Sequence, residues 1–147
     1  MKKIIAISSP GGHWTQLQRI TPAFKDHKIV YVSTLIGYAK EVSAFKYYKV
    51  KDASSWNKIG LIILFFQVFR IIFIEKPDVV ISTGAAPGLF AIILARIFGS
   101  KTIWLDSIAN YEKISFSGKI ARYFTHLHLT QWKHLATSKT HCSGAVL

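Results

Sequence analysis

Short apolar runs alternate with longer amphipathic stretches along the whole chain. The runs are rich in Ile and Val and lack the polar alternation of half-exposed strands, which is typical of strands buried on both faces of a parallel sheet. The predicted strands are Ile4–Ser8, Lys28–Ser33, Tyr47–Lys51, Asp78–Ser82, Lys101–Leu105 and His126–Thr130.

The segments between these runs predict helices. Trp14, Leu17, Ile20 and Phe24 recur at helical spacing, and Pro22 ends or kinks that helix. Further helices are predicted over Gly37–Ala44, over Asn57–Glu75, from about Pro87 to Gly99, and over Ser117–Phe124. This alternation predicts one α/β domain over residues 1–147, with a Rossmann-like, doubly wound and mostly parallel sheet between two layers of helices.

The loops after the predicted strands carry most of the unusual chemistry. They cover residues 8–13, 33–37, 83–88 and 106–110. The carboxyl ends of parallel strands lie at one edge of a sheet, and ligands bind there near the point where the strand order reverses. We therefore expect these loops to form a binding site.

The first loop carries Gly11, Gly12 and His13 at the start of a predicted helix. Glycines permit close backbone approach, and free N–H groups at a helix N-terminus favour a pyrophosphate or a sugar phosphate. The loop lacks both the G-x-G-x-x-G spacing of dinucleotide-binding folds and the lysine of a Walker loop. A tight turn that needs glycine is the alternative. His13 is a candidate base or hydrogen-bond donor, or else it caps the helix.

Small and hydroxyl-bearing residues make up the loop after the fourth predicted strand. Ser82 and Thr83 can bind a phosphate or a sugar through their hydroxyls, while Gly84, Pro87 and Gly88 leave space above the sheet edge. An ordinary capped helix start, with Pro87 in its first turn, explains the same residues and is the favoured interpretation of this loop by itself.

Asp106 and Asn110 place a carboxylate and an amide after the fifth predicted strand. Because the chain has only seven acidic residues, Asp106 is a candidate for orienting or deprotonating an acceptor hydroxyl, with turn or helix capping as the alternative. No Asp-x-Asp motif occurs in the sequence, which counts against a nucleotide held through a metal ion.

The histidines near the carboxyl terminus predict no metal site. His126, His128, His134, His141 and Cys142 match no familiar zinc-ligand spacing. Cys142 is the single cysteine, which excludes an internal disulfide and suits a reducing compartment. No signal peptide is recognisable, so we expect the chain to face the cytosol.

Charge and one apolar segment indicate the partners. Nineteen Lys and Arg residues against seven Asp and Glu give a formal charge of +12, which favours phosphates, acidic lipids or nucleic acid. The stretch 59–74 is apolar, but it is too short to span a bilayer and is interrupted by Gln67 and Arg70. Helix 57–75 is therefore either a buried helix or one whose outer side meets a membrane or a partner.

Four segments together resemble one family. They are GGHWTQL at 11–17, ISTGAAPG at 81–88, WLDSIANYEKISFSGKIAR at 104–122 and LTQW at 129–132. Jointly they are similar to the Alg-type membrane subunit of the split UDP-N-acetylglucosamine transferase of dolichol-linked oligosaccharide synthesis, and to its bacterial relatives in capsule and exopolysaccharide assembly. A more distant likeness is to the N-terminal half of the peptidoglycan N-acetylglucosaminyltransferase.

The resemblance implies a GT-B glycosyltransferase divided over two chains, of which this chain is the N-terminal, acceptor-side half. It implies a small C-terminal-half partner that holds a UDP-sugar, a lipid-pyrophosphate saccharide as acceptor, and inversion at the anomeric carbon. No cofactor is implied for this chain. His13 and Asp106 match positions that face the acceptor in the more distant relative. The domain is then expected on the cytoplasmic face of an anionic membrane, with helix 57–75 in peripheral or shallow contact.

Two other functions are compatible with the sequence. A non-catalytic anchor that recruits and enhances a separate glycosyltransferase would need the apolar helix but not the loop side chains. A basic nucleic-acid-binding module rests on charge alone, since no recognition motif supports it, and we expect no nucleic-acid partner.

Overall fold

Six parallel strands form a single sheet in the computed structural model, which describes residues 1–146. The strands are β1 (Lys3–Ile7), β2 (Lys28–Ser33), β3 (Lys46–Lys49), β4 (Val79–Ser82), β5 (Lys101–Leu105) and β6 (Leu127–Leu129). Their order across the sheet is β3-β2-β1-β4-β5-β6, and all neighbours are parallel. The order reverses between β1 and β4, which is where this architecture opens a crevice for a ligand.

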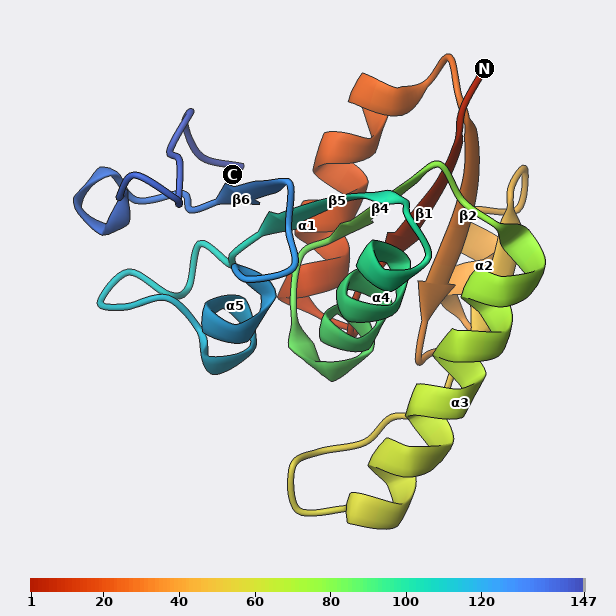
Figure 1. Ribbon diagram of the computed structural model, residues 1–147. Coiled ribbons are helices and arrows are strands. Elements are labelled where there is room, and N and C mark those ends of the chain that lie inside the picture. Colours follow the sequence, from red (N-terminus) through yellow and green to blue (C-terminus); the bar gives the residue numbers. More distant parts are fainter. Residues whose placement is uncertain (147) are drawn as a thin grey trace.

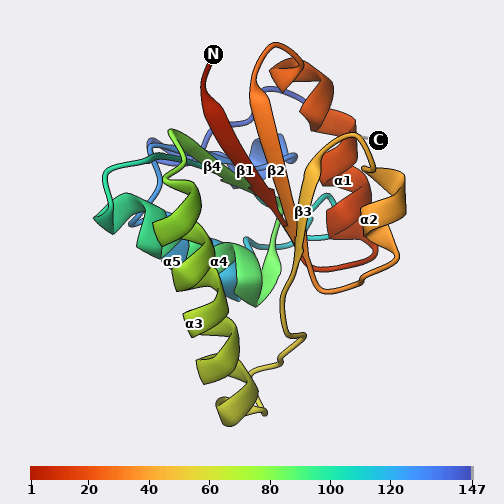
Figure 2. The same ribbon diagram turned by 90° about the vertical axis from the view of Figure 1, so that its right-hand side faces the viewer.

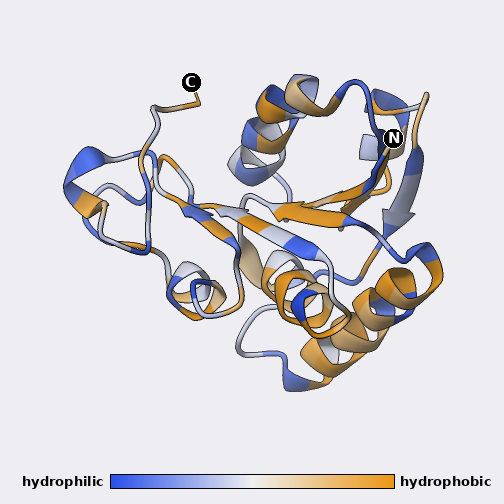
Figure 3. Ribbon diagram, turned by 45° about the horizontal axis from the view of Figure 1, so that its top comes forward, coloured by the Kyte–Doolittle hydropathy of each residue, from blue (hydrophilic) through white to orange (hydrophobic). Residues whose placement is uncertain are grey.

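Helices cover both faces of the sheet (Figure 1). They are α1 (Gly12–Ile20), α2 (Tyr38–Glu41), α3 (Lys58–Glu75), α4 (Ala85–Ile97) and α5 (Phe116–Ala121), with 3-10 turns at Thr21–Phe24 and Lys133–Leu135. Helices α1 and α2 lie on one face, and α3, α4 and α5 lie on the other (Figure 3). The predicted Rossmann-like, doubly wound fold is confirmed, and its sheet is entirely parallel.

The largest boundary errors fall on short elements. The helix predicted over 37–44 is a single turn, because Val42 leaves the helical conformation at φ −117° and ψ 37°. The strand predicted over 47–51 covers Lys46–Lys49, the length over which its backbone pairs with β2. The helix predicted over 117–124 begins at Phe116 and ends at Ala121.

Apolar side chains on both faces hold the sheet between its helices. Alternate residues of a strand point to opposite faces, so Ile5 and Ile7 of β1 pack in one cluster with Leu64 of α3. Ile4, from the same strand, packs in the other cluster with Leu17 of α1. The buried apolar runs recognised in the sequence are thus the two-sided core of the domain.

Helix α3 is buried along one side only. Its inward side carries Gly60, Leu64, Val68, Ile71, Ile72 and Glu75. We call its solvent-exposed side the α3 apolar face; it consists of Ile59, Ile62, Ile63, Phe66, Phe69, Phe73 and Ile74. The first turns of α3 extend past the rest of the molecule (Figures 1 and 2). Across residues 1–146, no helix combines the length and apolar character needed to cross a membrane.

Glu75 ties the end of α3 to the sheet. Its side chain is buried, with Oε2 3.3 Å from Lys3 Nζ and Oε1 2.5 Å from Lys46 Nζ, and the Tyr48 hydroxyl donates to Oε1. Burial acts to raise the pKa of Glu75, but hydrogen bonds from Lys46, Tyr48 and Lys3 outweigh it and lower this pKa to about 2. The hydrogen bond between Lys46 and Glu75 in turn raises the pKa of Lys46.

We expect the Glu75→Gln variant to lose an acid-sensitive part of the stability. A carboxyl whose pKa is lower in the folded chain stabilises it above the unfolded value of 4.5, and this contribution fades as the pH falls toward 2. The free energy of unfolding of the wild type should therefore fall over that range, and the variant should be less stable at neutral pH and show a flatter profile. Denaturant unfolding at a series of pH values measures both; parallel profiles would contradict the ion-pair assignment.

The two margins of the sheet are built differently. Strand β3, at one margin, reads KYYK and is only four residues long. At the other margin the chain returns alongside β6, because Leu129 and His141 form a parallel bridge and Thr130 N donates to His141 O at 2.9 Å. The C-terminal segment thus occupies the place that a further strand would take.

Candidate functional site

A cleft of about 240 Å³ opens at the carboxyl edge of the sheet. We call it the carboxyl-edge cleft; His13, Ala85, Ser107, Asn110, Ser115 and Phe116 are among the residues that line it. The loops after β1, β4 and β5 meet here, as the sequence predicts. The loop after β2 contributes no lining residue, which leaves three of the four expected loops at the cleft.

His13 is held in one orientation by the loop after β4. Its Nδ1 lies 2.8 Å from the carbonyl oxygen of Thr83, and the Thr83 hydroxyl donates to the His13 carbonyl at 2.6 Å. A carbonyl only accepts hydrogen bonds, so Nδ1 carries the proton and Nε2 of the neutral ring is an acceptor. Gly84, at φ 148°, lies directly under the imidazole, where a Cβ atom would collide with the ring. Gly84, which was expected from the sequence to leave space above the sheet edge, therefore leaves that space for the His13 ring.

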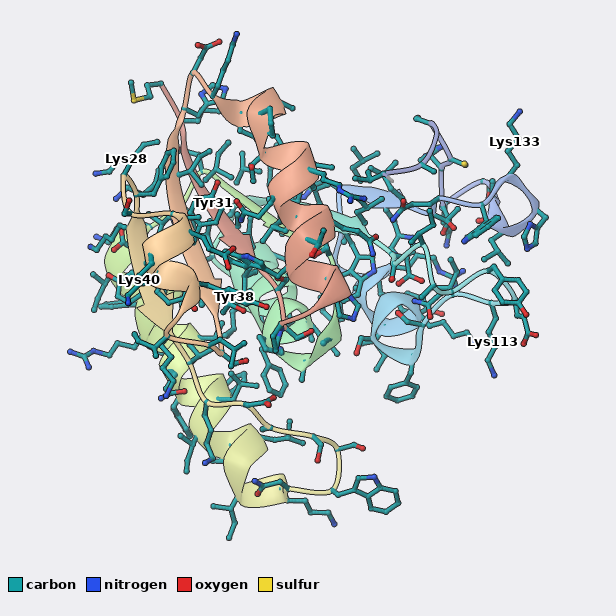
Figure 4. All side chains as sticks on the ribbon, turned by 180° about the vertical axis from the view of Figure 1, so that it is seen from behind. Lys28, Tyr31, Tyr38, Lys40, Lys113 and Lys133 are labelled. Atoms are coloured by element: carbon teal, nitrogen blue, oxygen red, sulfur yellow. The ribbon has the colours of Figure 1, made fainter. Side chains whose placement is uncertain are left out.

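Gly11 and Gly12 form the exposed turn into α1 beside His13. Gly11 has φ 80°, a conformation that favours glycine, and its N–H donates to the Tyr38 hydroxyl at 3.0 Å. Tyr38 reaches this turn from α2 (Figure 4). The first amides of α1 have no partner within the helix and carry partial positive charge. The turn thus has the exposure and polarity expected of an anion-binding loop.

The remaining residues of the β4 loop lie beneath the cleft surface. Ser82, Thr83, Gly84, Pro87 and Gly88 are all buried. The Ser82 hydroxyl accepts from the Gly84 amide at 3.1 Å, and the Thr83 hydroxyl is engaged by His13. Gly88 packs against Ser82 and Trp104, where a larger residue would collide. The structure does not bring these hydroxyls to the cleft; it uses them to shape the loop.

Asp106 is buried behind the cleft, and its carboxylate accepts four hydrogen bonds from the chain itself. Trp104 Nε1 donates to Oδ1 at 3.0 Å and Asn110 Nδ2 to Oδ2 at 3.2 Å. The amide and the hydroxyl of Ser115 donate at 3.0 and 2.6 Å. Gly118 packs so closely that an added Cβ atom would lie 2.5 Å from Oδ1. Asp106 thus fixes residues 106–118, whereas Asn110 also lines the cleft.

Two buried glutamines complete the site and were not singled out from the sequence. Gln131 Nε2 donates to Gln16 Oε1 at 2.5 Å and to the Asp106 carbonyl at 3.0 Å. Gln16 Nε2 donates to Ser107 Oγ at 3.2 Å, and Gln16 Oε1 also accepts from the Ile108 amide at 3.2 Å. The pair joins the His13-bearing helix to the β5 loop. Gln16 lies in the GGHWTQL segment and Gln131 in the LTQW segment of the family resemblance, which was the one signal for the pair in the sequence.

The C-terminal histidines have local structural contacts. His128 is buried, with Nε2 2.8 Å from the Gly118 carbonyl and Nδ1 3.0 Å from Thr140 Oγ1. Burial lowers its pKa, and the imidazole links α5 to β6 through these two contacts. Within residues 1–146 no three His, Cys, Asp or Glu side chains are grouped as metal ligands.

The strand order, the two helical layers and the carboxyl-edge cleft define the Rossmann-like domain that forms the N-terminal half of GT-B glycosyltransferases. MurG from Acinetobacter baumannii superposes with a TM-score of 0.77 and 12% identity, over 95% of this chain and 45% of that one. A UDP-N-acetylglucosamine 2-epimerase from Rickettsia bellii superposes with a TM-score of 0.73 and 19% identity, over 99% and 45%. At these identities the likeness concerns the fold.

Residues 49–146, two-thirds of the chain, match the family described as "Oligosaccharide biosynthesis protein Alg14 like". The chain belongs to this Alg14-like family. The UDP-N-acetylglucosamine transferase subunit alg14 of Schizosaccharomyces pombe is 33% identical in an alignment of 88 residues that covers 56% of this chain and 40% of that protein. The match thus spans less than half the length of this relative. The family resemblance read from the four sequence segments is confirmed.

Proposed function

We propose that the chain is the acceptor-binding and membrane-recruiting subunit of a two-chain, UDP-sugar-dependent inverting glycosyltransferase. The complex transfers a sugar to a lipid-pyrophosphate-linked saccharide at the cytoplasmic face of a membrane, in capsule or exopolysaccharide assembly. The observation that carries the proposal is the oriented His13 in the carboxyl-edge cleft, beside the first turns of α1 and α4, in an Alg14-like chain.

The carboxyl-edge cleft suits the anionic part of such an acceptor. The N-termini of α1 and α4 both reach it, and their free amides favour phosphate oxygens. Among the described residues that line it there is no Asp or Glu, and the Asp106 carboxylate behind it already accepts four hydrogen bonds. A pyrophosphate at these helix ends brings the hydroxyl of the linked sugar close to His13.

In this proposal His13 is the general base. Its Nε2 takes the proton of the acceptor hydroxyl, because Nδ1 is already committed to the Thr83 carbonyl. The hydroxyl oxygen bonds to the anomeric carbon while the bond from that carbon to the UDP oxygen breaks, so the carbon is inverted and UDP leaves. Asp106 holds the loop in place rather than taking the proton, because its oxygens already accept four hydrogen bonds.

A second chain is needed to hold the donor. The carboxyl-edge cleft, at about 240 Å³, falls below the roughly 300–1,000 Å³ of sites that enclose a small-molecule ligand. The relative in Schizosaccharomyces pombe is named a subunit of its transferase. Both facts support a partner that carries the UDP-sugar and closes over this cleft.

Purification of the tagged chain from detergent-solubilised host membranes tests this proposal. We expect a stoichiometric small partner with a nucleotide-sugar-binding fold, and UDP-sugar transfer to a lipid-pyrophosphate acceptor by the pair but by neither chain alone. Recovery of the chain by itself, or with nucleic acid, would overturn the split-enzyme proposal.

The α3 apolar face is the proposed membrane contact. It extends along the whole helix, and exposed cations flank it at Lys58, Arg70 and Lys76. Apolar side chains that enter the headgroup region, together with nearby cations, are what hold a peripheral protein on an anionic bilayer.

We expect the Ile62→Ser/Phe66→Ser double variant to bind lipid vesicles at least tenfold more weakly than the wild type. The two side chains are 57% and 62% exposed, and moving such apolar surface out of water contributes about 1–2 kcal/mol per side chain. Vesicle co-sedimentation measures the loss. The matched control is Tyr111→Ser/Tyr123→Ser, which removes two rings of similar exposure from the α5 side of the molecule; equal losses in both variants would argue against a defined contact face.

A further inference from the structure

A larger cavity, of about 480 Å³, lies at the opposite edge of the sheet from His13. It is formed where α3 and α4 end and where β1 and β5 begin. We call it the amino-edge cavity; the residues that matter for its chemistry are Lys2, Lys76, Lys101, Asp78, Phe73 and Phe98. Neither the family comparison nor the proposed transfer reaction gives this cavity a role.

The amino-edge cavity is cationic. Lys2, Lys76 and Lys101 come from three separate segments, and within residues 1–146 both side-chain ion pairs belong to Glu75, so none of these three ammonium groups is paired with a carboxylate. The single acid of the lining is Asp78, whose Oδ2 already accepts from the Lys3 amide at 2.8 Å. Three cations against one engaged carboxylate favour an anionic ligand.

The helix ends around the cavity do not cancel this charge. Helix C-termini carry partial negative charge through free carbonyls. For each helix this charge amounts to about half an elementary charge, so the ends of α3 and α4 together offset about one of the three lysines. Lys76 itself has φ 46° and ψ 59°, a left-handed cap position that glycine or asparagine usually fills. Lys76 thus places a cation at this cap, although glycine or asparagine would fit the backbone conformation better.

The apolar half of the cavity is continuous with the α3 apolar face. Phe73 belongs to both. Its ring stacks on Phe69 with centroids 6.2 Å apart, and Phe69 meets Phe98 edge-on at 5.7 Å. An apolar surface therefore leads from the outer side of α3 directly to the three lysines. This arrangement fits a ligand with an anionic head and an apolar tail.

We propose that the amino-edge cavity binds the phosphate headgroup of an anionic phospholipid whose acyl chains lie against the α3 apolar face. This inference rests on the membrane contact in the proposed function and names the lipid class that the contact selects. A headgroup held at the end of α3 also fixes the rotation of the domain on the bilayer, and thereby the direction in which the carboxyl-edge cleft faces.

Co-sedimentation of the full chain with vesicles tests the site. The vesicles are phosphatidylcholine alone, or phosphatidylcholine with a minority of phosphatidylglycerol, at physiological ionic strength, where the screening length is ~8 Å. The test variant is Lys2→Gln/Lys76→Gln/Lys101→Gln. The matched control, Lys113→Gln/Lys133→Gln/Lys139→Gln, loses the same charge from exposed lysines; Lys113 and Lys133 lie on the side of the molecule away from α3 (Figure 4).

We expect the test variant to bind the anionic vesicles about 100-fold more weakly, since each lysine at the bilayer surface is worth roughly fivefold. Its binding to neutral vesicles should be unchanged, and the control should stay within about threefold of the wild type. Equal losses in the two variants would show diffuse charge attraction and overturn the site. Binding of inorganic phosphate to the wild type without vesicles, at an affinity that the anionic vesicles do not exceed, would indicate a free-phosphate site and overturn the lipid assignment.

The outcomes also separate this inference from the proposed function. A wild type that binds both vesicle types equally keeps the membrane contact but refutes the headgroup site. A wild type that binds neither refutes both, and transfer by the purified complex to a detergent-dispersed acceptor then decides whether the catalytic part of the proposed function survives.

Discussion

The Asp106→Ala variant should lose about 3–5 kcal/mol of unfolding free energy. The substitution leaves Trp104 Nε1, Asn110 Nδ2 and both donors of Ser115 without their acceptor. Buried donors without partners cost about 1–3 kcal/mol each, and part of this penalty is relieved where water enters. Denaturant unfolding measures the loss, and the thermal midpoint should fall by about 10 °C.

The Asp106→Asn variant is the matched control. It keeps the volume and one acceptor oxygen, so it should lose less stability than the alanine variant while still loosening residues 106–118. If Asp106→Ala were as stable as the wild type but the complex had lost transfer, the carboxylate would act in the chemistry and the loop-organising assignment would be wrong.

The His13→Ala variant should reduce sugar transfer by the assembled complex by about 10²–10⁴-fold, the usual contribution of a positioned general base. The imidazole is only partly buried and its hydrogen bond goes to one backbone carbonyl, so the free energy of unfolding should change by about 1 kcal/mol or less. Steady-state kinetics at saturating donor and acceptor measure the effect on kcat, and added imidazole should restore part of it.

Wild-type turnover in His13→Ala would remove this residue from the mechanism. If the Ile62→Ser/Phe66→Ser variant lost transfer at the same time, the chain would be the non-catalytic anchor. The two variants lie in separate parts of the chain, one in the cleft and one on α3. The pair therefore distinguishes a catalytic subunit from a recruiter.

The sequence predicted the fold well because this sheet is buried on both faces. Runs such as Lys101–Leu105 have no interpretation other than a short strand or part of a longer helix, and flanking turn residues decide between them. The errors fall at Gly37–Ala44, Tyr47–Lys51 and Ser117–Phe124, near the two margins of the sheet, where fewer contacts fix the ends and local propensity is a weak guide.

The sequence predicted which loops meet at the site but not which side chains reach its surface. Ser82 and Thr83 have the right chemistry and position, yet both side chains are fully buried. That outcome depends on how closely α4 packs on Ser82 at Gly88 and on the bond from Thr83 to the His13 carbonyl of α1, which no local pattern encodes. Gln16 and Gln131 were missed for a related reason: the two are far apart in the sequence, and a glutamine within a helical pattern is ordinarily exposed.

The long apolar helix was predicted either to be buried or to pack on the sheet with an outer side that meets a membrane or a partner. The fully buried alternative is wrong, and the contact of the outer side stays a prediction. One side of α3 packs on the sheet through Leu64 and Val68, and the other carries exposed phenylalanines and isoleucines. Composition alone gives both sides the same hydropathy, so only the packed structure shows which residues face solvent.

The margins of the sheet bear on how the protein behaves at high concentration. An exposed strand edge is a template for pairing with other molecules. On the β3 side the strand is short and carries lysines at both ends, and on the β6 side the returning chain covers the ladder at His141. If the proposed membrane recruitment holds, it concentrates copies of the chain side by side, where open strand edges would lead to aggregation. Lysines on one margin and a covering segment on the other would then keep the sheets of neighbouring copies from pairing.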